Sequence, residues 1–202
     1  MCGAFLFSSR YETGYPMYDL LFEKALRTAA IAHKQQTRKG SEIPYIYHPF
    51  AVSTLLMRYQ YPNDWCIAAL LHDTLEDTDI DEAYLEKEFG DRILQLVKSC
   101  SEPNHDTASW EKRKEHTIQF LRSAPLPVKI ISCADKLHNL HSIVYDMHEI
   151  GDQLWARFNR GKSQQQWYHQ NIASSLKENV TPLSDHPILN EYEHIISKVF
   201  SP

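Results

Sequence analysis

The sequence predicts an all-α protein, and three observations support that fold class. Glycine supplies only 6 of the 202 residues. Alternation of polar and apolar residues, which marks half-buried strands, is sparse, whereas apolar residues at intervals of three and four recur along the chain. We therefore expect a compact bundle of about eight to ten helices. They cover residues 18–36, 48–59, 63–76, 81–88, 90–100, 109–123, 126–147, 150–157, 163–178 and 187–200.

Residues that favour helix ends support these boundaries. Pro49 suits the first turn of the second helix, because that position needs no backbone N–H donor. Asn63 or Asp64 can cap the third helix, and Ser109 can cap a charged one. Pro125 interrupts the helical pattern before the apolar run at 128–134, so a new helix should begin there.

Length and composition describe an ordinary globular domain. Hydrophobic residues make up 43% of the chain and charged residues 23%, which excludes disordered and collagen-like classes. A chain of this size can bury a substantial core without a structural metal. We expect one domain at residues 18–180, preceded by an N-terminal extension at 1–17 and followed by a C-terminal helix at 181–202 that packs on the same domain.

Charge and cysteine usage limit the partners and the compartment. The formal net charge of -5 argues against a nucleic-acid surface, which would carry a clustered basic excess. No apolar run approaches membrane-spanning length, and no basic leader precedes the short apolar patch near the N-terminus, so we expect no membrane partner and no secretion. The four cysteines form no C-x-x-C pair and are interpreted as reduced thiols of a cytoplasmic protein. The sequence makes no prediction of oligomeric state.

An adjacent histidine and aspartate, His72 and Asp73, carry the strongest chemical signal. They follow an apolar run at 66–71, so part of the site should lie near the core, where unpaired carboxylates are costly. Glu76 and Asp77 come four residues later and, on a continuous helix, would share one face with the first pair. An imidazole beside a carboxylate suits a divalent cation that accepts nitrogen and oxygen ligands.

Two further segments place ligand-type residues at the end of apolar or aromatic runs, and they supply His48 and Asp135. If the three segments converge, His48, His72, Asp73 and Asp135 offer four ligands and leave positions open for water and substrate. A six-coordinate ion such as Mn²⁺ fits that set, since two carboxylates balance its charge. Taken singly, His48 is more often a structural histidine, and Asp135 also fits a buried ion pair with Lys136.

A basic loop at 37–44 is a candidate for anion binding. It carries Arg38 and Lys39 just ahead of His48 and is rich in turn-forming residues. On the residues alone it is interpreted either as a binding loop or as a solvated loop.

A second basic segment, at 155–169, interleaves aromatic residues with Arg157, Arg160 and Lys162. Two interpretations fit it equally. It closes over a nucleotide polyphosphate through phosphate contacts and ring stacking, or it is a basic turn between two helices whose Trp167 and Tyr168 face the core.

Five stretches in a fixed order form a pattern far more specific than a His-Asp dipeptide. They are Ala32–Lys39, Pro44–Pro49, Ala69–Thr78, Phe89–Gly90 and Ala134–Leu140. With this series the chain resembles the HD-domain phosphohydrolases. It resembles more closely the hydrolase domain of Rel/SpoT-type alarmone enzymes and the stand-alone small alarmone hydrolases. The resemblance runs from Leu21 to Leu176, which is nearly the whole chain.

The resemblance implies an HD-domain helical bundle with a bound manganese ion. The implied ligands are His48, His72, Asp73 and Asp135. Catalytic roles are implied for Glu76 and Asp77. Glu76 would act as general base toward the attacking water, and Asp77 would orient that water or hold a histidine in its metal-binding tautomer.

The resemblance also implies the substrate, the 3′ diphosphate of a guanosine or adenosine alarmone, released as pyrophosphate. Arg38 and Lys39 are then expected to approach the base and the phosphates, and Asn139 and Ser142 the ribose. The synthetase, TGS and ACT regions of the long bifunctional enzymes have no room in 202 residues, so we expect degradation without synthesis.

Two alternatives stay open at this point. The first is an HD-type phosphatase of another nucleotide, such as NADPH or a deoxynucleotide, because the metal chemistry is the same and the pocket decides. The second is a non-catalytic nucleotide sensor. It predicts loss of a ligand or of Glu76, and the sequence keeps both.

Overall fold

The fold is all-α, as the sequence predicts. The computed structural model describes residues 19–101 and 109–201. Within these ranges the only extended pairing is an isolated bridge between Thr37 and Pro44. The expected N-terminal extension at 1–17 lies outside the described residues.

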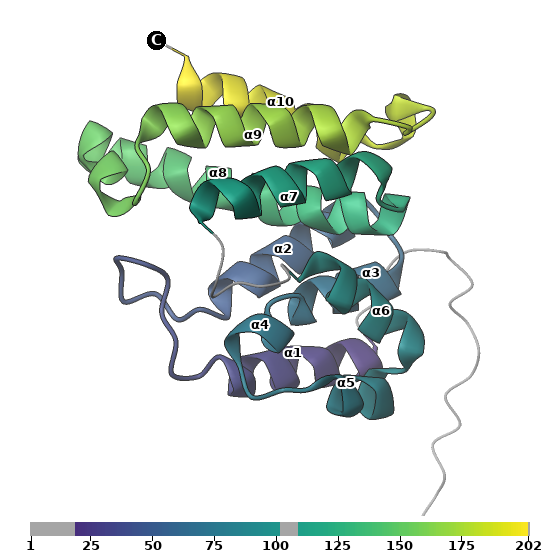
Figure 1. The fold of residues 1–202 in the computed structure, drawn as a ribbon. Coiled ribbons are helices and arrows are strands. Elements are labelled where there is room, and N and C mark those ends of the chain that lie inside the picture. The colour runs from purple at the N-terminus through teal and green to yellow at the C-terminus, as the bar shows by residue number, and fades with distance from the viewer. Residues whose placement is uncertain (1–18, 102–108, 202) are drawn as a thin grey trace, which may run out of the picture.

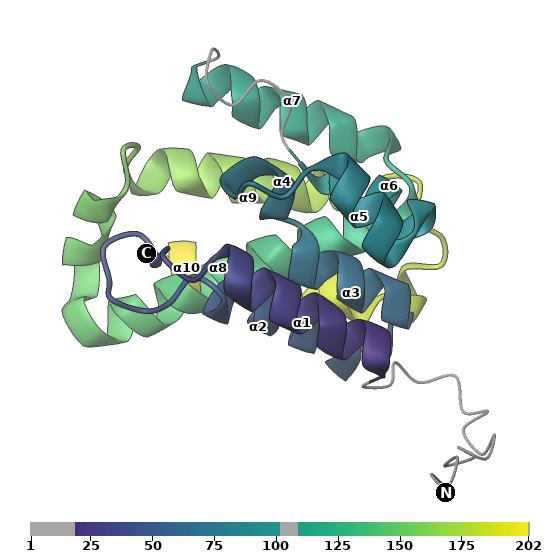
Figure 2. The same ribbon diagram turned by 90° about the horizontal axis from the view of Figure 1, so that it is seen from below.

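The helices lie in two layers (Figures 1 and 2). One layer contains α1 (Leu20–Ala32), α2 (Tyr47–Arg58), α3 (Asn63–Leu71), α4 (Thr74–Asp77), α5 (Glu82–Phe89) and α6 (Asp91–Cys100). The other contains α7 (Trp110–Ser123), α8 (Leu126–Ile150), α9 (Lys162–Lys177) and α10 (Pro187–Phe200). Two short 3₁₀ helices, η1 (Gly151–Arg157) and η2 (Leu183–Asp185), join elements of the second layer.

Helix α3 is the centre of the first layer. Every residue from Trp65 to Leu71 is buried, and the helix packs against α1, α2, α6 and α8. A helix that is apolar all round is stable only when neighbours cover all its faces. The apolar run ahead of His72 therefore fixes the depth at which the His-Asp pair lies.

Helix α8 joins the two layers. Pro125 precedes it, and a second proline occupies its first turn, where no N–H donor is required. The helix packs against α2, α3 and α6 on one side and against α9 and α10 on the other. Asp135, in the middle of α8, is therefore carried to the boundary between the layers.

The predicted helix at 63–76 is interrupted, which corrects the expectation of one continuous helical face. Helix α3 ends at Leu71, and α4 begins at Thr74. The hydroxyl of Thr74 donates to the carbonyl of Leu71 over 2.6 Å, which offers that carbonyl a partner other than a helical N–H. The Asp77 amide still donates to the Asp73 carbonyl over 3.0 Å, so Asp77 stays one turn from Asp73.

The predicted caps have mixed outcomes. Ser109 accepts from the amide of Lys112, as expected for the start of α7. The expectation that Asn63 or Asp64 caps α3 is wrong, because the helix already includes both residues and Pro62 precedes it. Their side chains bind neighbouring elements: Asn63 donates to Asp19, and Asp64 pairs with Arg92.

Two helix predictions differ in extent or type. Helix α1 ends at Ala32 instead of 36, and the turn that follows is held by a 2.7 Å hydrogen bond between His33 and Gln36. The segment predicted as a helix at 150–157 is the 3₁₀ helix η1, which follows the end of α8. None of the helices in the described ranges has the length and apolarity needed to cross a membrane.

Candidate metal centre and active site

The four predicted ligand residues lie where α2, α3 and α8 meet. The ligand atoms of His48, His72 and Asp73 all lie within 4.8 Å of one another. His72 Nε2 is 3.2 Å from Asp73 Oδ2, and His48 Nε2 is 3.8 Å from the same oxygen. His48 Nε2 is also 3.2 Å from Asp135 Oδ1, so Asp135 joins the group through His48.

The donor set fits a divalent cation, and His72 gives the clearest indication. Its Nδ1 lies 2.8 Å from the Ala69 carbonyl. A carbonyl only accepts, so Nδ1 carries the hydrogen and Nε2 keeps its lone pair. Among the described residues this buried Nε2 has no hydrogen-bond partner. This lone pair faces the carboxylate of Asp73, and a cation placed between the two groups would bind both.

Each carboxylate of the centre is held by neighbouring groups. The hydroxyl of Tyr45 donates to Asp73 Oδ2 over 2.8 Å. Lys136 donates to Asp135 Oδ2 over 2.6 Å, and Asn139 donates to Asp135 Oδ1 over 2.8 Å. Such contacts orient metal-binding carboxylates before any ion is bound.

The electrostatics of the site favour an ionised Asp135 beside a neutral His48. Burial lowers the pKa of His48, against the opposing effect of Asp135. Burial alone would raise the pKa of Asp135, but Lys136 and His48 lower it well below its usual value. Burial, and then the charge of Asp73, raise the pKa of Tyr45, so its hydroxyl remains a donor. This is the protonation pattern that metal binding requires.

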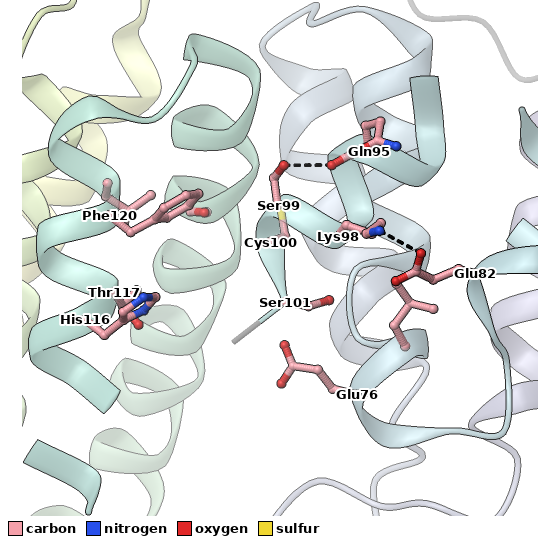
Figure 3. Close-up of a pocket in the computed structure, with 13 residues that line it drawn as sticks. Glu76, Glu82, Gln95, Lys98, Ser99, Cys100, Ser101, His116, Thr117 and Phe120 are labelled. Atoms are coloured by element: carbon pink, nitrogen blue, oxygen red, sulfur yellow. Dashed lines mark hydrogen bonds and ion pairs between the residues drawn. The ribbon is translucent and has the colours of Figure 1, made fainter. Parts of the chain in front are cut away.

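Glu76 projects from α4 into a cavity (Figure 3). The cavity has a volume of about 640 Å³ and lies between α4 to α6 on one side and α7 and α8 on the other. Cys100 and Ser132, which lies three residues before Asp135 on α8, also line it. Asp77, one turn from Asp73, accepts at its backbone carbonyl from the side chain of Gln36.

The basic loop reaches the candidate metal centre through Arg38, whose partner Asn139 donates to Asp135. Its guanidinium donates to Asn139 Oδ1 over 2.7 Å and lies 5.7 Å from the centre of the Tyr45 ring. Lys39 is exposed. Ser142, one turn beyond His138, donates to the His138 carbonyl over 3.2 Å. The structure thus brings Arg38 and Asn139 together, whereas Ser142 is engaged by its own helix.

The second basic segment is divided among different contacts. Arg157 pairs with Asp146 over 2.9 Å, and its aliphatic portion lies against Gly40 of the basic loop. Arg160 pairs with Glu111 at the start of α7. Lys162 lies 5.9 Å from the centre of the Trp155 ring. Arg157 therefore lies next to the loop of Arg38.

Two residues of the site were missed by sequence reasoning. Tyr45 lies in the aromatic stretch before His48, and only its contact with Asp73 distinguishes it from a packing residue. His138 Nδ1 lies 2.7 Å from His48 Nδ1. Its position three residues after Asp135, on the same helical face, was the available signal.

Comparison with known proteins gives the family. The HD domain family model matches residues 25–162. The guanosine-3′,5′-bis(diphosphate) 3′-pyrophosphohydrolase MESH1 of Drosophila melanogaster is 38% identical over 127 residues, which are 60% of this chain and 69% of that protein. The enzyme of the same activity name from Borreliella burgdorferi is 37% identical over 127 residues, which cover 60% of this chain. The chain spans only 19% of the length of that enzyme and 18% of the Aquifex aeolicus relative.

Solved structures agree with the sequence relatives. A crystal structure of a Listeria monocytogenes EGD-e protein superposes with a TM-score of 0.71 at 36% identity, covering 77% of this chain and 99% of that one. A metazoan ortholog of SpoT, described as hydrolysing ppGpp, superposes with a TM-score of 0.72 at 26% identity, covering 90% of this chain and 97% of that one. The chain belongs to the HD domain family.

Proposed function

We propose that this protein is a manganese-dependent hydrolase that removes the 3′ diphosphate of alarmone nucleotides such as (p)ppGpp or (p)ppApp. The products are pyrophosphate and a nucleoside 5′ di- or triphosphate. The single observation that carries the proposal is the cluster of His48, His72 and Asp73, whose ligand atoms lie within 4.8 Å of one another, with Asp135 3.2 Å from His48 Nε2.

The relatives support the reaction class. MESH1 of Drosophila melanogaster, which this chain matches over 69% of its length, is named for the 3′-pyrophosphohydrolase reaction. The metazoan SpoT ortholog is described as hydrolysing ppGpp. We extend that activity to this chain, and with it a role in the stringent response. The free thiols of Cys66, Cys100 and Cys133 support a cytoplasmic location.

The chemistry follows from the charges of the site. A divalent cation held there would acidify a water molecule and polarise a phosphoryl oxygen. His48, His72, Asp73 and Asp135 would hold it. Mn²⁺ suits this mixed set of imidazole and carboxylate donors.

Glu76 is the proposed general base. Its carboxylate takes a proton from water as the water oxygen bonds to the phosphorus attached to O3′. The bond between that phosphorus and O3′ breaks, and O3′ receives a proton in place of the one that Glu76 took, either from Glu76 itself or from solvent water, so atoms and charge balance. Asp77, one turn from Asp73, would orient the water or a ligand histidine.

The nucleotide would lie over the loop of Arg38 and Lys39. The guanidinium of Arg38 presents a planar, charged surface for a base or a phosphate beside Asn139. The exposed Lys39 adds a positive charge, and Ser142 adds a hydroxyl near the ribose. Arg157 lies close enough to the loop to take part, and we include Arg160 and Lys162 as outer phosphate contacts.

A substrate panel tests the proposal. Purified protein with Mn²⁺ is offered ppGpp, pppGpp, ppApp, NADPH and deoxynucleoside triphosphates, and pyrophosphate and phosphate are measured. Turnover of an alarmone with pyrophosphate release is expected. Turnover of NADPH or a deoxynucleotide alone would reject the alarmone assignment, and tight binding of ppGpp without turnover of any nucleotide would indicate a sensor.

Two variants separate metal binding from proton transfer. Glu76→Gln should keep the bound Mn²⁺ and lower kcat by about 10²–10⁴-fold, the usual contribution of a general base. Asp135→Ala should lower both metal content and activity. Full metal content and full activity in Asp135→Ala would remove Asp135 from the ligand set.

A further inference from the structure

The two histidines of the metal centre differ in what holds their second ring nitrogen. His72 Nδ1 bonds to the Ala69 carbonyl, a backbone acceptor within its own helix. His48 Nδ1 instead lies 2.7 Å from Nδ1 of a third histidine, His138 on α8. His138 is 4% exposed and meets Tyr47 edge to face, with ring centres 5.1 Å apart.

This contact decides which nitrogen of His48 carries the hydrogen. His48 Nε2 faces Asp135 Oδ1 at 3.2 Å and Asp73 Oδ2 at 3.8 Å, so a cation held by the carboxylates requires the lone pair of His48 at Nε2. The hydrogen must then be on Nδ1, and it needs an acceptor there. His138 Nδ1 is the acceptor within reach, provided that His138 carries its own hydrogen on Nε2.

The surroundings of His138 are consistent with a role as the acceptor for His48 Nδ1. Within the described part of the chain, His138 Nε2 is buried and has no hydrogen-bond partner. Burial of an unpaired polar atom is costly, so packing alone would favour an apolar ring at this position. The polar contact that the ring does make is the one to His48.

We propose that His138 is a positioning residue: by accepting a hydrogen bond from His48 Nδ1, it fixes His48 in the tautomer and ring orientation that binds the metal. The proposal rests on the metal centre of the proposed function. It adds a residue outside the ligand set that sets metal affinity. Partners of this kind alter metal affinity by about 10–100-fold when they are removed.

Calorimetric titration of chelator-stripped protein with Mn²⁺ tests the proposal without using activity. His138→Phe keeps a ring and removes the acceptor, and His138→Leu removes the acceptor with a smaller side chain. His138→Asn places an amide oxygen near the position of Nδ1 and restores an acceptor. We expect the Phe and Leu variants to bind Mn²⁺ about 10–100-fold more weakly and the Asn variant to bind nearly as tightly as wild type.

A matched control is His169→Phe. His169 is another buried histidine, bonded to Tyr192 over 2.7 Å between α9 and α10. Its replacement should lower the melting temperature of the metal-free protein and leave Mn²⁺ affinity unchanged. Melting curves of all variants without metal identify those that fold.

Three outcomes would overturn the role of His138. The first is wild-type affinity in a folded Phe or Leu variant. The second is an equal loss in the Asn, Phe and Leu variants, which would mean that shape alone matters. The third needs no substitution: electron spin-echo spectra of the Mn²⁺-loaded wild type should show two imidazole nitrogens, and a single one would exclude His48 as an oriented ligand. Absence of Mn²⁺ binding in wild type would instead reject the proposed function.

Discussion

Tyr45→Phe removes one oxygen atom from the edge of the candidate metal centre, and its effect can be worked out from the contacts. The Tyr45 hydroxyl donates to Asp73 Oδ2 over 2.8 Å. That same oxygen lies 3.2 Å from His72 Nε2 and 3.8 Å from His48 Nε2. The hydroxyl therefore positions the carboxylate oxygen that both imidazoles face. The ring itself packs against His33 and stays in the variant.

The magnitude follows from the charge of the acceptor. A hydrogen bond to a charged group contributes about 1.5–3 kcal/mol. Since each 1.4 kcal/mol is tenfold in an equilibrium constant, Tyr45→Phe should weaken Mn²⁺ binding by about 10–100-fold. The pKa of Tyr45 is raised by burial and by Asp73, so the hydroxyl is a donor throughout the neutral pH range.

Calorimetric titration with Mn²⁺ measures the effect, and Tyr61→Phe provides the control. The Tyr61 hydroxyl lies 3.2 Å from His186 Nδ1, so its loss should leave the metal affinity unchanged. A Tyr45→Phe protein that binds Mn²⁺ as tightly as Tyr61→Phe would refute the claim that this hydroxyl orients Asp73.

Three further predictions concern stability and the substrate loop. Lys129 is 2% exposed and donates to three backbone carbonyls at the ends of α7 and α9. Lys129→Met should lower the free energy of unfolding by about 3 kcal/mol, measured in urea, with the Mn²⁺ affinity of the folded protein unchanged. Burial lowers the pKa of His169 to about 3 from 6.5. Below pH 6.5 the unfolded chain therefore binds a proton that the folded protein does not bind. The free energy of unfolding then falls by about 1.4 kcal/mol for each unit by which the pH is lowered. His169→Phe should reduce that slope, and equal slopes would contradict the assignment. Gly40 has φ of +73°, and a Cβ there would lie 3.4 Å from Arg157 Cδ. Gly40→Ala should strain the loop by about 1–2 kcal/mol and raise KM at unchanged Mn²⁺ affinity; an unchanged KM would separate the loop from substrate binding.

The spacing of apolar residues was sufficient to predict most helices, because each of them buries one face. The apolar spacing at 187–200 predicts α10, which the structure has at Pro187–Phe200. The break between α3 and α4 could not be predicted in this way, because the helical spacing of apolar residues continues across residues 72–73, where the structure has the hydroxyl bond from Thr74 to the Leu71 carbonyl.

From the sequence, the convergence of the proposed ligand residues could be stated only conditionally, because nothing local shows that the three motifs meet. Each of the three motifs ends an apolar or aromatic run, and such runs lead into the core. Which side chains contact one another at the site depends on packing between distant segments, and the sequence has no local signal for that packing. Tyr45 and His138 illustrate this, because their roles consist of hydrogen bonds to Asp73 and to His48, across 28 and 90 residues.

The same packing connects the substrate loop to the metal centre. Asn139 donates to Asp135 through its amide nitrogen and accepts from Arg38 through its amide oxygen. One side chain therefore touches both a proposed ligand and a proposed nucleotide contact. A phosphate or base that engages Arg38 competes with Asn139 for the same donors, while the bond from Asn139 to Asp135 can remain. Binding of the proposed nucleotide would then exchange partners at one end of Asn139 and leave Asp135 oriented, so substrate binding to the loop would not disturb the candidate metal centre.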